Sequence, residues 1–207
     1  MKAILSRLLY GKPVILVSGL PRSGTSMLML MLKEAGLTIV CDHFRTADED
    51  NPRGYHELER VKELDKTKEK SWLKQHRGEV IKIISFLLQD LPDNLNYKVI
   101  FMRRDLREVL HSQNRMLERN GQAGVGASDE KMHKNYDLHL RKVTYRLGRA
   151  PNFQVLYLDY LNVVANPRRA AERISEFLGG GLDVDKMAGA VDAELYRNRH
   201  AHVAHEK

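Results

Sequence analysis

The stretch VILVSGLPRSGTS, which runs from Val14 to Ser26, decides the fold of this chain. Its first residues, Val14 to Val17, are all apolar, as is typical of a buried strand. A glycine-rich turn from Gly19 to Ser26 follows, and a helix is expected from Met27 to Ala35. These elements form a phosphate cradle, because backbone N–H groups and the positive end of the helix converge on an anion. We therefore predict a phosphate site at the turn; the alternative is a turn with a purely structural role.

The spacing of two glycines in the turn narrows the kind of phosphate ligand. Gly19 and Gly24 have the G-x-x-x-x-G spacing of a Walker A loop, but Thr25 follows where a loop that hydrolyses a nucleoside triphosphate has lysine. That lysine contacts the β- and γ-phosphates. Its absence predicts a site that holds phosphate without handling a triphosphate in the usual way.

The rest of the chain alternates between strand-like and helix-like segments. Strands are expected at 14–18, 38–41, 80–84, 97–102 and 153–158, and helices at 24–35, 57–76, 106–119, 129–147 and 167–178. Strands that are apolar throughout are typical of a parallel sheet covered on both faces. We therefore predict a single α/β domain over residues 1–207, doubly wound, with a mostly parallel central sheet and its site at the carboxyl ends of the strands.

The composition is that of an ordinary globular protein with an excess of positive charge. The 207 residues include 34 basic and 27 acidic ones, a net charge of +7, which favours anionic partners. Nucleic acid is not expected as a partner, because the basic residues are scattered and aromatic residues make up only 7%. No run reaches the roughly 20 apolar residues that cross a bilayer, so no membrane partner is expected. Cys41 is the only cysteine, which favours a reducing, cytoplasmic location.

A second candidate anion site follows the predicted strand at 97–102. Arg104 comes just after this strand, and Ser112 lies eight residues further on, about two turns along the chain of a helix. An arginine and a serine placed in this way can converge on one anion. The alternative is that the arginines only solvate the helix start. Cations at a helix N-terminus oppose its dipole, however, and are unfavourable there without a ligand.

These motifs resemble those of the sulfotransferase family that uses 3′-phosphoadenosine 5′-phosphosulfate. The family's 5′-phosphosulfate loop reads P-[KR]-[ST]-G-T-[ST], and the residues from Pro21 to Ser26 match it throughout. Its 3′-phosphate motif is an arginine after a strand with a serine eight residues later, which Arg104 and Ser112 match. The segment NPRGYHE, from Asn51 to Glu57, is similar to an N-P-x-G-Y-x-E stretch of bacterial members.

A further segment, from Val155 to Gly179, looks like the family's region around Y-E-D and the helix that follows it. Tyr160 takes the tyrosine place, whereas Leu161 and Asn162 replace the acidic pair. The resemblance therefore extends from about Val14 to Gly179, with one departure from the family pattern.

The resemblance implies a role for each residue of the turn. Ser23, Gly24, Thr25 and Ser26 would hold the 5′-phosphosulfate together with the N–H groups of the loop. Arg22 would stabilise the oxygen that leaves with the 5′-phosphate, in the place where many family members carry lysine.

The resemblance also implies a second set of donor contacts. Arg104 and Ser112 would bind the 3′-phosphate, and Tyr160 would contact the donor. Lys82, inside the predicted strand at 80–84, matches a strand lysine near the transferred group; the alternative is a lysine at an exposed edge. The product would be adenosine 3′,5′-bisphosphate. No metal is expected, because no γ-phosphoryl charge has to be bridged.

The catalytic base is not identified by the resemblance. Cytosolic family members carry a histidine two residues after the strand lysine, and this chain has Ile84 there. Asp42, His43 and Glu57 are the candidates. We favour Asp42, because a carboxylate at the carboxyl end of a strand suits a doubly wound site.

Two other functions stay open at this point, and the sequence identifies neither the acceptor nor the oligomeric state. A P-loop kinase of a small metabolite would bind ATP with Mg²⁺, clamp phosphates with Arg103 or Arg104, and use Asp159 in the manner of a Walker B acid. A non-catalytic homologue would keep the nucleotide pocket without transferring a group.

Overall fold

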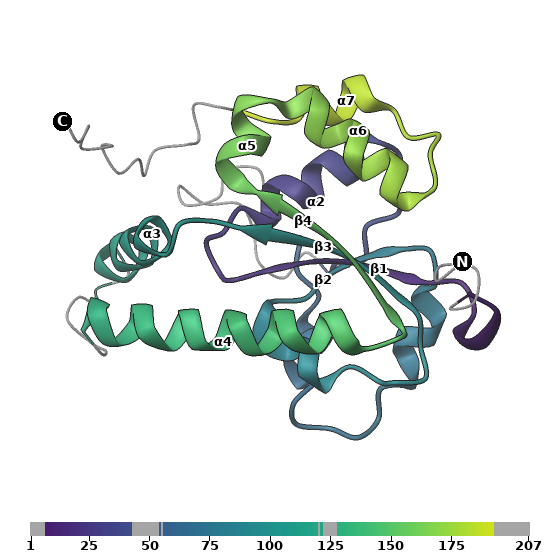
Figure 1. Cartoon of the computed structure of the whole chain (residues 1–207), viewed down its shortest axis with the longest axis horizontal. Helices are drawn as coiled ribbons and strands as arrows, with labels where there is room; N and C mark the ends of the chain where they lie inside the picture. Colours follow the sequence, from purple (N-terminus) through teal and green to yellow (C-terminus); the bar gives the residue numbers. More distant parts are fainter. Residues whose placement is uncertain (1–6, 43–53, 55, 120, 122–127, 193–207) are drawn as a thin grey trace.

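The computed structural model describes residues 7–42, 54, 56–119, 121 and 128–192. These residues contain a sheet of four strands in the order β2-β1-β3-β4, and each neighbouring pair is parallel (Figure 1). The strands are β1 (Val14–Gly19), β2 (Val80–Lys82), β3 (Tyr97–Arg103) and β4 (Phe153–Asp159). The predicted α/β fold with a parallel central sheet is confirmed.

Helices cover both faces of the sheet (Figure 1). One face carries α2 (Thr25–Glu34), α5 (Tyr160–Ala165), α6 (Pro167–Leu178) and α7 (Val184–Gly189). The other carries α4 (Asp129–Arg149) and the 3₁₀ helices η1 (Glu59–Glu63), η2 (Ser71–His76) and η3 (Ser85–Asp90). Helix α3 (Leu106–Arg119) lies past the carboxyl end of β3. Within the described residues, no helix is both long and apolar enough to span a membrane.

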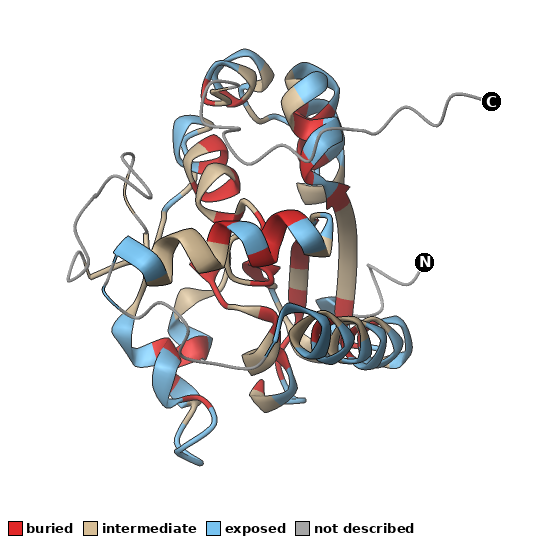
Figure 2. Cartoon of the chain, turned by 90° about the vertical axis from the view of Figure 1, so that its left-hand side faces the viewer, coloured by how far each residue is buried: buried red, intermediate tan, exposed pale blue. Residues whose placement is uncertain are grey.

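Each face of the sheet has its own apolar core. Successive residues of a strand point to opposite faces, so Ile15 and Val17 pack in the core under α2, whereas Leu16 and Phe101 pack in the core beside α4. Figure 2 shows the buried residues gathered on the strands and on the helix sides that face them. Because both faces are covered, all six residues of β1 are buried. This explains why the strand begins with four apolar residues in a row, Val14 to Val17, instead of alternating.

The predicted strand at 38–41 is wrong. Ile39 forms an isolated parallel bridge to Val80, supported by N–H bonds that link Val80 to Thr38 and Val40 to Val80. The neighbouring strand β2 is three residues long, shorter than the predicted 80–84, because the chain turns into η3 after Ile84. The pairing of this segment with β2 is limited to the bridge at Ile39, so residues 38–41 do not form a strand.

The single helix predicted at 57–76 is also wrong, since the structure has the two short helices η1 and η2 with a turn between them. In that turn the backbone N–H groups of Glu69 and Ser71 donate to the side chains of Thr67 and Glu69, at 3.1 and 2.9 Å. Bonds from side chains to nearby backbone compete with helix formation. The apolar side chains of both short helices still reach the core beside α4.

Candidate active site

The loop between β1 and α2 is closed by its own hydrogen bonds. The N–H and the hydroxyl of Ser23 both donate to the carbonyl of Leu20, at 3.2 and 2.7 Å. Arg22 (φ 68°) and Gly24 (φ 101°) both have positive φ. For a residue with a side chain this conformation costs on the order of 1–3 kcal/mol and gathers at functional sites. The strain at Arg22 therefore points to a use for its position in the loop.

The N-terminus of α2 opens onto this loop. Its N-cap residue, Gly24, has no side chain that could cap the helix, and the first turn contains no acidic residue. The first N–H groups of a helix have no partners within the helix, and its dipole is positive at this end. Ser23 and Thr25 are buried here. A helix start of this kind can bind an anion.

Tyr160, the first residue of α5, packs directly against the loop. A Cβ atom added to Gly24 would lie 2.4 Å from Cδ2 of Tyr160, so the close approach needs glycine at this position. The ring of Tyr160 also contacts Arg104, whose Cζ atom lies 4.3 Å from the ring centroid. Burial raises the pKa of the Tyr160 hydroxyl, which keeps it protonated. Tyr160 thus joins the loop to the arginine of the second predicted anion corner.

The two predicted anion corners lie next to each other. Nε of Arg22 donates to Oγ of Ser112 at 3.0 Å, across 90 positions of the chain. Nη1 of Arg104 donates to the carbonyl of Arg22 at 3.2 Å. Ser112 is almost completely buried in α3. The arrangement is suited to one ligand that carries two separate anionic groups.

Lys82 points into the same site from the end of β2. Its side chain is only 7% exposed, and its Nζ atom donates to the hydroxyl of Ser26 at 3.3 Å. The same atom lies 3.1 Å from Oε1 of Glu57. The alternative of a lysine at an exposed edge is therefore wrong. Lys82 provides a buried positive charge beside the loop.

The candidate bases occupy different surroundings. Asp42 accepts a short hydrogen bond from the backbone N–H of Glu59, and its own N–H donates to the carbonyl of Glu57. The carboxylate of Asp42 is thus engaged at the start of η1, while the carboxylate of Glu57 lies against Lys82. His43 lies outside the described residues.

One residue of the site was missed by the sequence analysis. Glu108, in the first turn of α3, forms an ion pair with Arg104 in which Oε2 lies 2.9 Å from Nε. The spacing of four residues between an arginine and a glutamate could have indicated this pair. The structure thus brings together the following predicted residues: Arg22, Ser23, Gly24, Thr25, Ser26, Lys82, Arg104, Ser112 and Tyr160.

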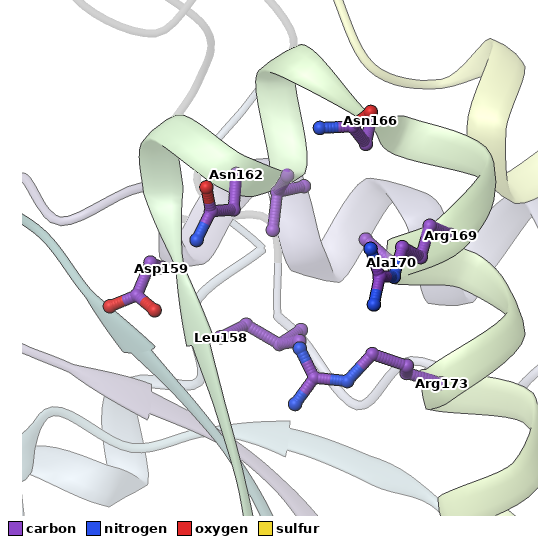
Figure 3. Close-up of a pocket in the computed structure, with 8 residues that line it drawn as sticks. Leu158, Asp159, Asn162, Asn166, Arg169, Ala170 and Arg173 are labelled. Carbon is purple, nitrogen blue, oxygen red and sulfur yellow. The ribbon is translucent and has the colours of Figure 1, made fainter.

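Asp159, the acid that the kinase alternative would use in the manner of a Walker B residue, lines a different pocket. Asp159 lines a pocket of about 280 Å³ with Asn162, Arg169 and Arg173, between the end of β4 and helices α5 and α6 (Figure 3). All four of these polar side chains are exposed, so the pocket has no buried binding group. Among residues 7–42, 56–119 and 128–192, no three His, Cys, Asp or Glu are grouped as a metal site.

Comparisons with known proteins bear on the family and the fold of this chain. The family model described as "Sulfotransferase domain" matches residues 12–199. Sulfotransferase STF9 from Mycobacterium avium has a similar structure, with a TM-score of 0.56 and 13% identity over 92% of this chain and 69% of that one. The sulfotransferase domain of the Synechococcus PCC 7002 olefin synthase gives a TM-score of 0.55 and 17% identity, covering 89% and 79%. At these identities the likeness shows the fold alone.

Two further relatives extend the comparison. Mouse sulfotransferase SULT7A1, solved as a complex with PAP, has a TM-score of 0.50 and 13% identity over 93% of this chain and 71% of that one. A Caenorhabditis briggsae protein described as "Putative protein-tyrosine sulfotransferase" is 35% identical over 85 residues. That match spans 40% of this chain and 29% of the relative's length.

Proposed function

Because this chain belongs to the sulfotransferase family, we propose that it transfers a sulfuryl group from 3′-phosphoadenosine 5′-phosphosulfate to a hydroxyl or amine acceptor. The observation that carries the proposal is the 3.0 Å hydrogen bond between Arg22 and Ser112, which joins the loop to the second anion corner. A donor with a 5′-phosphosulfate and a separate 3′-phosphate needs two neighbouring anion sites rather than one extended triphosphate channel. Nothing in the comparisons favours a kinase.

The residues of the two corners fit such a donor. The N–H groups at the start of α2, with Thr25 and Ser26, would hold the 5′-phosphosulfate. Arg104 and Ser112, with the ring of Tyr160 against Arg104, would hold the 3′-phosphate. The bound donor supplies the sulfuryl group, and adenosine 3′,5′-bisphosphate remains after transfer.

Two cations would stabilise the charge that develops during transfer. Arg22 projects from a strained position in the loop and is oriented by Ser112, so its guanidinium would stabilise the oxygen that leaves with the 5′-phosphate. Lys82 holds its ammonium beside Ser26 and would stabilise the transferred group. Both charges are positioned before any ligand binds, which limits the reorganisation needed during reaction.

The proton of the acceptor needs a base at the same place. Glu57 lies against Lys82, at the carboxyl edge of the sheet, and its carboxylate can accept that proton. Asp42 is the base that the sequence favoured; its carboxylate accepts from the N–H of Glu59 at the start of η1, whereas that of Glu57 lies against the lysine that contacts the loop. We therefore propose Glu57 as the base, and we keep Asp42 as the alternative that mutagenesis has to test.

Two further properties that the sequence predicts are kept as proposals. We propose that residues 1–207 form one domain, which the family match over residues 12–199 supports. The single cysteine, Cys41, supports a reducing, cytoplasmic location.

A ligand panel tests the proposed function directly. The melting temperature is measured with adenosine 3′,5′-bisphosphate in EDTA, with ATP and Mg²⁺, and with AMP. A ligand that binds the native state raises the melting temperature with its excess over the dissociation constant. We expect the largest shift from the bisphosphate without metal. A shift from ATP and Mg²⁺ alone would favour the kinase, and bisphosphate binding without transfer to any acceptor in a panel would favour a non-catalytic homologue.

A further inference from the structure

We propose that Glu108 is a positioning residue that orients Arg104 and thereby sets the preference of the site for nucleotides with a 3′-phosphate. The proposal rests on the proposed function, because it assigns Arg104 to the 3′-phosphate. It concerns a carboxylate that the sulfuryl-transfer chemistry does not use.

The ion pair between Arg104 and Glu108 is almost completely buried. Its two side chains are 8% and 10% exposed, and Nε of Arg104 lies 2.9 Å from Oε2 of Glu108. Ion pairs at the surface are weak, but a buried charge that loses its partner is strongly destabilised. The ion pair with Glu108 therefore strongly favours this position of the Arg104 side chain.

The start of α3 does not need Glu108 as a cap. Oδ1 of Asp105 accepts the N–H groups of Arg107 and Glu108, at 2.8 and 3.3 Å, which are the capping contacts of this helix start. The observed partner of the Glu108 carboxylate is the guanidinium of Arg104.

Three contacts together determine the orientation of the Arg104 guanidinium. Glu108 holds its Nε edge, the carbonyl of Arg22 accepts from Nη1 at 3.2 Å, and the ring of Tyr160 covers one face at 4.3 Å from Cζ. A planar group held at one edge, at one terminal nitrogen and on one face can neither rotate nor tilt. The direction of its other N–H groups is therefore set as well.

A carboxylate beside a phosphate site has an electrostatic cost, because like charges repel. We infer that its benefit is geometric: an oriented guanidinium loses less entropy when it binds phosphate. The charge and the geometry can be separated experimentally. Glutamine at position 108 keeps an oxygen that accepts from Nε but has no charge, whereas alanine keeps neither.

The test compares adenosine 3′,5′-bisphosphate with AMP, which lacks the 3′-phosphate, by isothermal titration calorimetry. In Glu108→Ala, affinity for the bisphosphate should fall about 10-fold or more, with affinity for AMP unchanged. Glu108→Gln should retain most of the wild-type preference for the bisphosphate. Glu118→Ala, which removes an exposed carboxylate from the same helix, should bind both nucleotides as the wild type does. Far-UV circular dichroism and melting curves confirm that each variant is folded.

Three results would overturn the proposal. Glu108→Ala could bind the bisphosphate as tightly as the wild type, or lose both nucleotides by the same factor, which would indicate a purely structural role. Glu108→Gln could lose as much affinity for the bisphosphate as Glu108→Ala does, which would show that the charge of Glu108, and not its geometry, is responsible. A wild-type protein that binds the bisphosphate no better than AMP would instead refute the proposed function, so the two failures are distinguishable.

Discussion

Nζ of Lys82 lies 3.1 Å from Oε1 of Glu57, although 25 positions separate the two residues. The same ammonium donates to the hydroxyl of Ser26 in the loop, at 3.3 Å. One buried cation therefore connects the anion cradle with the carboxylate that we propose as base. A base in this position would act next to the transferred group, where the acceptor has to attack.

This contact predicts that Glu57→Gln lowers kcat for sulfate transfer by about 10²- to 10⁴-fold, because an amide cannot accept the acceptor's proton. Affinity for adenosine 3′,5′-bisphosphate should stay close to that of the wild type. Steady-state kinetics with an acceptor found in the panel, together with calorimetry, measure both quantities.

Asp42→Asn is the matched control for this variant. Asparagine keeps a side-chain oxygen for the N–H of Glu59, so the start of η1 should be preserved and most of the turnover retained. If Asp42→Asn abolished turnover while Glu57→Gln did not, Asp42 would be the base.

Ser112 is predicted to contribute to nucleotide binding through Arg22 and through its own hydroxyl. We expect Ser112→Ala to weaken binding of adenosine 3′,5′-bisphosphate by about 10-fold, since a hydrogen bond to a charged group is worth roughly 1.5–3 kcal/mol. Calorimetric titration measures this loss.

Ser175→Ala is a suitable control, because Ser175 is also a buried serine but lies in another helix, α6. Its hydroxyl accepts from the N–H of Leu182 at 3.3 Å. We expect Ser175→Ala to lose about 1 kcal/mol in the free energy of unfolding and Ser112→Ala about 1.5–3 kcal/mol, because the partner of Ser112 is charged. Equal nucleotide affinity in the two variants would argue against the second anion corner.

Gly24 is predicted to tolerate no side chain. Gly24→Ala places a Cβ atom 2.4 Å from the ring of Tyr160 at a φ of 101°. Backbone strain and steric overlap both destabilise this variant, so we expect a loss of about 2–5 kcal/mol in the free energy of unfolding. Bisphosphate binding should weaken as well, because Tyr160 must move away from the loop.

Gly36→Ala separates strain from overlap. Gly36 has a similar φ of 86°, but a Cβ atom there would meet nothing within 4 Å. Only the strain of about 1–2 kcal/mol should appear, with unchanged nucleotide binding. Denaturant unfolding of both variants provides the comparison, and equal losses would show that Tyr160 adapts without cost.

A partly buried serine–histidine contact predicts how stability depends on pH. Oγ of Ser85, fully buried at the start of η3, lies 2.9 Å from Nε2 of His139 in α4, and Phe86 stacks on the histidine ring. Burial, with a smaller contribution from Lys142, lowers the pKa of His139 below its usual 6.5. The unfolded chain therefore binds this proton at a higher pH than the folded protein does.

The free energy of unfolding should consequently decrease as the pH falls from about 6.5 toward the pKa of His139 in the folded protein. Above about pH 6.5 His139 is neutral in both states, and the stability that depends on its neutral form is fully present. Thermal melts between pH 5 and 8 measure the slope. In His139→Gln the slope should be shallower in this range. An unchanged slope would mean that His139 titrates alike in both states.

Local patterns predicted those parts of the structure that depend on neighbours in the chain. The strand from Val14 and the turn after it follow from an apolar run and from two glycines, and α6 was predicted with both of its ends, Pro167 and Leu178. The residues at 38–41 and 57–76 were predicted incorrectly. There the structure depends on how far the pairing with β2 extends and on side-chain bonds within the turn, which periodicity does not reveal.

The sequence alone predicted the buried strand from Val14, the glycine-rich turn after it and a parallel sheet, because apolar runs and closely spaced glycines are local features of the chain. The tertiary structure was needed to show that Ser112 lies beside Arg22, that Tyr160 packs on Gly24, and that Glu57 lies against Lys82. These residues are far apart in the chain, and they meet because the parallel sheet brings the carboxyl ends of its strands to one edge.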